Sequence, residues 1–105
     1  MKFVNLTKHS IKDLLSNKEY AVPRNSVVVN VSEVIIRESD GTMITKLVYG
    51  DIVGLPAPQE DVMYIVSAVV LNALNGSRED CVAPSRPVRD SKGVVMGCRG
   101  FRTNG

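Results

Sequence analysis

Apolar and polar residues alternate along the first half of the chain, which is the pattern of β-strands. The strongest such signal runs from Ser26 to Arg37, where every apolar residue is a Val or Ile. The apolar positions are odd-numbered up to Val31 and even-numbered at Val34 and Ile36. Because side chains alternate between the two faces of a strand, this change of phase predicts a β-bulge near Ser32–Glu33 or burial on both faces.

A hairpin is predicted directly after this strand. Asp40-Gly41 lies between two strand-like runs, and Asp-Gly is a common two-residue hairpin turn. The return strand is expected over Met43–Tyr49. Shorter strands are expected at residues 3–6, 11–15, 62–66 and 81–83, and a second hairpin at 88–96.

One short helix is predicted over residues 68–75. Ser67 is a suitable N-cap, and Asn75-Gly76 is a typical helix end. The apolar residues Val69, Val70, Ala73 and Leu74 form one stripe at helical spacing. We therefore expect an α+β fold, with a small, mostly antiparallel sheet and one short core helix.

Composition supports a single globular domain over residues 1–105. The chain has 105 residues, of which 44% are hydrophobic and 5% aromatic, so one core without staples is expected. The net charge of +2 conceals an uneven distribution. From residue 81 to the end, five basic residues stand against the single acid Asp90; they are Arg86, Arg89, Lys92, Arg99 and Arg102. Such a region can attract phosphates or an acidic protein surface, or can be the solvent-facing side of a hairpin.

We expect no membrane contact and a cytoplasmic location in the host cell. No apolar run approaches the roughly 18 residues of a membrane-spanning helix, and the N-terminus lacks the features of a signal peptide. Cys81 and Cys98 are then expected to be reduced thiols. Their spacing, with the single histidine His9, matches no usual zinc class, so we expect neither a metal nor a cofactor.

The strongest candidate for an anion site is the start of the helix. The Ser67 hydroxyl and the free N–H groups of the first helical turn favour an anion. The preceding loop lacks phosphate-wrapping glycines, however, and a plain N-cap is the preferred interpretation of Ser67. Arginine is suited to forked capture of carboxylate or phosphate, which makes Arg78, Arg86 and Arg89 candidates. Arg78 with Asp80 fits a structural surface pair equally well.

Two further groups of residues are candidates for a binding or catalytic role. Arg99-Gly100-Phe101-Arg102 places an aromatic ring between two cations, an arrangement that can bind single-stranded nucleic acid. The alternative is a frayed tail. His9 with Cys81 or Cys98 is the only thiol–imidazole pair available for nucleophilic catalysis.

Several short motifs together resemble a family of small uncharacterised proteins found in phages, prophages and other bacterial genomes. They are Asn5-Leu6-Thr7 near His9, Tyr49-Gly50, Gly54-Leu55-Pro56, Tyr64-Ile65-Val66-Ser67, Arg78, Asp80, Pro84 and Val88-Arg89-Asp90. The resemblance spans most of the chain. One departure is Lys8, where such proteins often have Pro. The resemblance implies a phage accessory protein and brings no established activity.

The leading hypothesis is therefore a non-enzymatic binding protein that occupies a host protein or complex, such as an anti-CRISPR-like inhibitor of a host defence system. The alternative is a nucleotide- or small-anion-binding module that uses Ser67 and the arginines. A virion or assembly component and a small hydrolase remain further alternatives. Homodimerisation through an exposed strand edge fits any of them.

Overall fold

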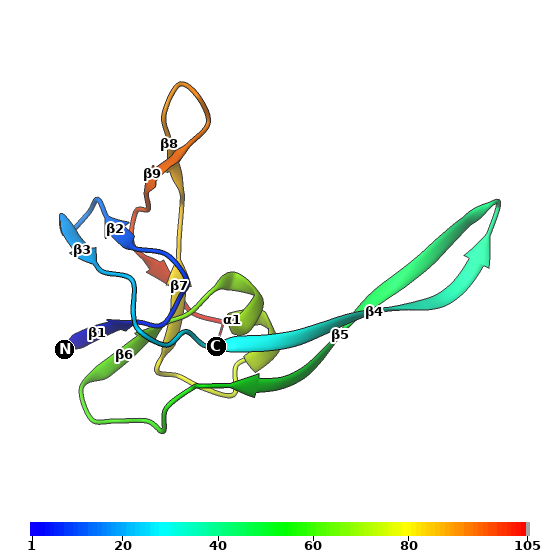
Figure 1. The fold of residues 1–105 in the computed structure, drawn as a ribbon, viewed down its shortest axis with the longest axis horizontal. Coiled ribbons are helices and arrows are strands. Elements are labelled where there is room, and N and C mark those ends of the chain that lie inside the picture. The colour runs from blue at the N-terminus through cyan, green and yellow to red at the C-terminus, as the bar shows by residue number, and fades with distance from the viewer. Residues whose placement is uncertain (105) are drawn as a thin grey trace.

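A small body and a long projecting hairpin make up the molecule (Figure 1). The computed structural model describes residues 1–104. The body contains strands β1 (Lys2–Asn5), β2 (Ile11–Asp13), β3 (Lys18–Tyr20), β6 (Val62–Ile65), β7 (Cys81–Pro84), β8 (Val88–Arg89), β9 (Val95–Gly97) and β10 (Phe101–Arg102), and helix α1 (Ala68–Leu74). The projecting hairpin consists of β4 (Val28–Ser39) and β5 (Thr42–Val53). We call this hairpin the arm.

The central sheet of the body has four strands in the order β1-β6-β7-β10. Strands β1 and β6 pair in parallel, as do β6 and β7, and β10 closes the sheet antiparallel to β7. Parallel neighbours need a crossover connection. Helix α1 provides the crossover from β6 to β7, and the whole arm lies within the crossover from β1 to β6.

Helix α1 covers one face of this sheet and builds the main core. Its N-cap is Ser67, whose Oγ accepts a hydrogen bond from the Val70 N–H at 3.2 Å. Asn75 ends the helix in the left-handed conformation, with φ 49°. A helix of seven residues is marginal alone, so packing has to stabilise it. Its buried residues Val70, Leu71 and Leu74 join a core cluster with Val27, Tyr64, Val66, Cys81 and Ala83.

Aromatic rings join the N- and C-terminal parts of the body. The rings of Phe3 on β1 and Phe101 on β10 stack with centroids 5.4 Å apart. Tyr20 on β3 meets both rings at 6.1 Å. Such contacts stabilise by roughly 0.5–1.5 kcal/mol beyond the area they bury. They attach the β2–β3 hairpin to the central sheet.

The arm makes the molecule much less compact than a globular chain of the same length. Its turn residues Asp40 and Gly41 have φ values of 53° and 79°, the left-handed pair of a tight hairpin turn. All residues from 30 to 44 are exposed. The radius of gyration is 16.1 Å, whereas a compact chain of this length has about 13 Å. The arm is thus a two-stranded ribbon that the body contacts only at its base (Figure 1).

The expected α+β class, mostly sheet with one short helix, is confirmed. The central sheet, however, is mixed, and the antiparallel pairs lie mainly in separate hairpins. The predicted bulge near Ser32–Glu33 is wrong, because the β4–β5 register is unbroken from Val31 to Ile35. The irregularities lie on either side, between Val29 and Val31 and between Ile35 and Arg37. Within the described residues, no helix has the length and apolar character to cross a membrane.

Candidate functional site

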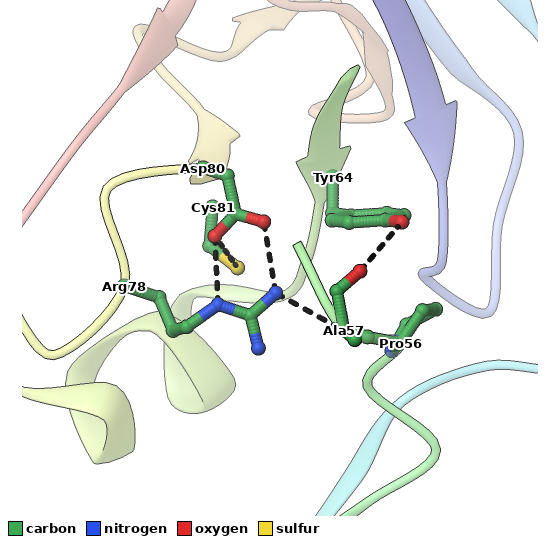
Figure 2. Close-up of polar contacts among 6 residues, drawn as sticks. All are labelled: Pro56, Ala57, Tyr64, Arg78, Asp80 and Cys81. Carbon is green, nitrogen blue, oxygen red and sulfur yellow. Dashed lines mark hydrogen bonds and ion pairs between the residues drawn. The ribbon is translucent and has the colours of Figure 1, made fainter. Parts of the chain in front are cut away.

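Arg78 and Asp80 form a forked ion pair just before β7 (Figure 2). The Nε and one terminal nitrogen of Arg78 donate to the two carboxylate oxygens of Asp80, each at 2.8 Å. The same terminal nitrogen donates to the Pro56 carbonyl at 2.9 Å. The hydrogen bond from Arg78 holds the pKa of Asp80 below its ordinary value, and the same bond raises the pKa of Arg78. The pair thus ties the proline loop to the end of the helix connection.

The loop is held at a second point by Tyr64. Its hydroxyl donates to the Ala57 carbonyl at 3.3 Å, beside the Arg78 contact (Figure 2). The side chains of Arg78 and Asp80 are only 20% and 16% exposed. The hydrogen bonds of Arg78 with Asp80 and Pro56 are enough to hold the two side chains together, so their arrangement needs no bound ligand to explain it. This favours the structural alternative for these two candidates.

Ser67 lies in a groove between the helix and the base of the arm. The groove has a volume of about 270 Å³ and is lined by Thr7, Lys8, His9, Val27, Val28, Val29, Ser67, Val69 and Val70. Valines predominate, and Lys8 is the one cation of the lining. The sequence did not indicate that Ser67 would meet Lys8 and His9, since they are far apart along the chain. The hydroxyl of Ser67 is already used as the helix N-cap.

The predicted arginines of the C-terminal region do not line the grooves that contain Ser67 and Arg78. Arg86 and Arg99 are brought together, because the Arg99 N–H donates to the carbonyls of Ser85 and Arg86 at 3.0 and 3.2 Å. Arg89 is used within its own hairpin, where its side chain donates to the Gly93 carbonyl at 2.9 Å. Arg102 lies on β10, paired with Ala83. Within the described residues, hydrogen bonds join these seven predicted residues only as the pairs Arg78–Asp80 and Arg86–Arg99.

The two thiols lie outside the groove that His9 lines, and burial raises the pKa of each thiol. Cys81 belongs to the core cluster, and burial raises its pKa to about 11. Burial likewise raises the pKa of Cys98, which lines a different groove beside Lys12 and Pro84. His9 lines the groove at the helix start. A thiol must become a thiolate to act as a nucleophile, so this arrangement does not support the thiol–imidazole alternative.

The surface that sequence reasoning missed is the arm. Of the nineteen large apolar residues exposed in the described part of the chain, eleven lie on the arm, and each is 36–57% exposed. They are Val28, Val31, Val34, Ile35, Ile36, Met43, Ile44, Leu47, Val48, Tyr49 and Val53. An apolar surface of this extent marks an interaction site. The signal was present in the sequence as the two-sided apolar pattern of residues 26–37.

The register of the arm divides its residues between two faces. Residues paired across a hairpin lie on the same face, and neighbours along a strand lie on opposite faces. One face carries Val31, Glu33, Ile35, Glu38, Met43, Thr45, Leu47 and Tyr49; we call it the acidic face. The other carries Ser32, Val34, Arg37, Ser39, Thr42, Ile44, Lys46 and Val48; we call it the basic face. The Thr45 hydroxyl donates to Glu33 at 2.5 Å, which places these two side chains together on the acidic face.

No protein-family model, curated protein sequence or solved structure matches the chain. The candidate site therefore has to be judged on its own geometry. On that basis the arm is the strongest candidate, because it combines a large exposed apolar surface with two glutamates on one face and an arginine and a lysine on the other.

Proposed function

We propose that this chain is a non-catalytic binding protein of phage or prophage origin that acts through protein–protein contacts made by the arm. Its concrete form is an accessory protein that acts in the host cytoplasm and occupies a component of a host defence system. The observation that carries the binding function is the arm, where eleven large apolar residues stand in solvent. The phage origin rests on the sequence resemblance.

The arm supports binding because such a ribbon gains little stability by itself. A two-stranded hairpin without a further layer is marginally stable in water. Here the strands have 12 residues each, yet the body contacts them only near the base. A long apolar hairpin of this kind is stabilised by a partner that covers it.

The nucleotide- or anion-binding alternative has weaker support. Arg78 is hydrogen-bonded to Asp80 and Pro56, and none of the other predicted arginines lines the groove that contains Ser67. A thermal-shift panel of nucleotides and inorganic phosphate separates the two functions. Stabilisation by a nucleotide that is lost in Ser67→Ala would favour the anion module, whereas a protein-binding chain shows no such shift.

The proposed function is tested by capture with a matched variant. The tagged full chain and a variant with residues 31–49 replaced by an Asn-Gly turn are passed through lysate of a bacterial host. The partner captured by the full chain is then purified and remixed with each form. Direct binding to the full chain and none to the short-armed variant supports the proposal. Equal binding to both forms contradicts the assignment of the arm.

The defence-related form has its own measurement. The chain is expressed in bacteria whose CRISPR or other defence system restricts a test phage, and plating efficiency is compared with that of cells expressing the short-armed variant. Restored plating with the full chain alone is expected. Unchanged restriction in strains where the captured partner is present would contradict an anti-defence role.

A further inference from the structure

The arm carries charges of opposite sign on its two faces. Glu33 and Glu38 lie on the acidic face, and Arg37 and Lys46 lie on the basic face. All four residues are exposed, and among the residues that the structure describes none of them takes part in an ion pair. The two anions and the two cations therefore stand ready for a partner on opposite sides of one thin ribbon.

Both faces are apolar as well as charged. The acidic face exposes Val31, Ile35, Met43, Leu47 and Tyr49, and the basic face exposes Val34, Ile44 and Val48. A partner that covered one face alone would leave the large apolar side chains of the other face in water. Because exposed apolar surface of this extent marks a contact, we expect both faces to be covered.

The area of the arm leads to the same expectation. Each strand has 12 residues and spans about 40 Å at about 3.3 Å per residue. Two strands are about 10 Å wide, so each face offers about 400 Å². A stable interface buries roughly 800 Å² on each partner. Contact through both faces reaches that value, whereas contact through one face gives about half of it.

We propose that the arm inserts lengthwise into a cleft of its partner protein, with an apolar and basic wall against the acidic face and an apolar and acidic wall against the basic face. Such insertion rests on the proposed function, in which the arm makes protein–protein contacts, and it specifies the shape and charge of the partner's surface. The body is much broader than the arm (Figure 1), so it remains outside the cleft and stops insertion at the base of the arm.

Other occupants fit the arm less well. A flat protein surface covers one face only. A nucleic acid is a polyanion, which the acidic face repels. Further copies of the chain, stacked face to face in the same direction, would lie about 10 Å apart. The smallest extent of the molecule is 25 Å, so the bodies of such copies would overlap.

The cleft is tested first by thiol labelling of the two faces. Val34 and Ile35 are neighbours on β4, lie on opposite faces, and are 40% and 57% exposed. Val34→Cys and Ile35→Cys therefore place a thiol on each face at the same depth, while the native Cys81 and Cys98 are buried. Each variant is labelled with a maleimide, alone and with the partner that the full chain captured. Ser91→Cys, in the exposed turn between β8 and β9, is the control.

The purified partner is expected to slow labelling at both arm positions by more than about tenfold, because the core of an interface excludes water and with it the reagent. Labelling of Ser91→Cys is expected to stay unchanged. Slowing at one arm position alone would indicate a flat contact and would overturn the cleft. Labelling that slows at both positions as the free chain is concentrated would show that copies of the chain cover the arm, and it would overturn the cleft as well.

The charges of the two walls are tested by reversal. Glu33→Lys with Glu38→Lys makes the acidic face basic, and Arg37→Glu with Lys46→Glu makes the basic face acidic. Each pair is expected to weaken binding of the purified partner more than about tenfold in calorimetry, because like charges then face each other across the contact. If one pair weakened binding and the other tightened it, the partner would carry a single sign of charge, and walls of opposite sign would be ruled out.

The controls for reversal make the same changes in net charge outside the arm. Glu60→Lys with Glu79→Lys matches the first pair, and Lys18→Glu with Lys92→Glu matches the second; all four residues are exposed. Both controls are expected to bind as wild type does, and circular dichroism verifies that every variant is folded. Controls that weakened binding as much as the arm variants would show that net charge, and not the two walls, is responsible.

Failure of the cleft and failure of the proposed function are distinguishable. A partner that requires the arm but protects only one face overturns the cleft and leaves the proposed function standing. A full chain that captures no partner overturns both, as does a partner that binds the short-armed variant equally well.

Discussion

Gly97 is the residue at which β9 passes closest to the backbone of β2. An added Cβ would lie 2.9 Å from the Lys12 carbonyl oxygen and 3.1 Å from Leu14 Cγ. The same Lys12 carbonyl accepts the Cys98 N–H at 2.9 Å, and Leu14 N–H donates to the Cys98 carbonyl at 2.8 Å. The absence of a side chain at residue 97 thus allows β9 and β2 to come close enough for these hydrogen bonds.

Gly97→Ala is therefore expected to lower the free energy of unfolding by about 1–3 kcal/mol, the usual cost of overpacking. Urea unfolding of both forms measures this difference. Gly93→Ala is the control for glycine replacement in general, because nothing lies within 4 Å of a Cβ there, although its φ of 82° adds a cost of backbone strain. If Gly97→Ala were as stable as wild type, the close approach would be absent in solution.

Asp80 makes stability depend on pH. Its pKa is lowered in the folded protein, first by the hydrogen bond from Arg78. A lowered folded-state pKa means that the stabilisation is complete above the unfolded-state pKa of about 3.9 and is lost as pH falls below it. Asp13 has a lowered pKa as well, with the Ser16 hydroxyl as the largest cause.

Asp80→Asn is expected to cost about 1–3 kcal/mol at neutral pH, because it leaves the charged Arg78 without its anion. It should also flatten the loss of stability between about pH 5 and pH 2. Thermal unfolding across that pH range measures both effects. Asp13 still contributes to the pH dependence of stability in this variant. If the stability of Asp80→Asn fell with pH as steeply as that of wild type, the role of the Arg78–Asp80 pair would be contradicted.

At the residue scale, the sequence predicted local contacts and missed distant ones. Ser67 was predicted as an N-cap because its partner Val70 lies in the next turn. Arg78 and Asp80 were predicted as a pair because they lie only two positions apart in the sequence. The contact of Arg78 with the Pro56 carbonyl depends on how two loops pack, which no local pattern contains.

At the scale of elements, the arm should be separable from the body. Among the residues of the arm and those that lead into it, only Val27 belongs to the core cluster, and Val29 and Ile52 pack against its margin. Replacing residues 31–49 with an Asn-Gly turn is expected to change the unfolding temperature of the body by only a few degrees. Thermal unfolding followed by near-ultraviolet circular dichroism measures this. Loss of the cooperative transition would show that the body depends on the arm.

The elements themselves were predicted better than their pairing. The helix and the Asp40-Gly41 hairpin carry strong local signals, and both are confirmed. The parallel pairing of Lys2 with Val62 joins distant segments, and alternation alone does not specify a partner. The change of phase in β4 has its origin in the two faces of the arm, both of which carry apolar residues, rather than in a bulge at Ser32–Glu33.

At the scale of the whole molecule, partner binding should be visible in amide exchange. In the free chain, amide hydrogens of residues 31–49 are expected to exchange fastest and those of β6 and β7 slowest, because the arm lacks a covering layer. When the captured partner is bound, protection is expected to rise in the arm while the body changes little. Hydrogen–deuterium exchange with and without that partner measures this, and an arm whose exchange is the same in both would contradict the assignment of the arm as the binding surface.

The arm also has a consequence for synthesis on the ribosome. The pairing of its two strands closes around a two-residue turn, whereas β1 pairs with β6 only after Val62 has been made, and the central sheet is complete only after β7 and β10. Local contacts form early, and distant ones late. The two strands of the arm can therefore pair while the chain is still being made, but a lone hairpin stays marginally stable until a partner covers it. A partner that is present during synthesis can meet the arm before the body is complete.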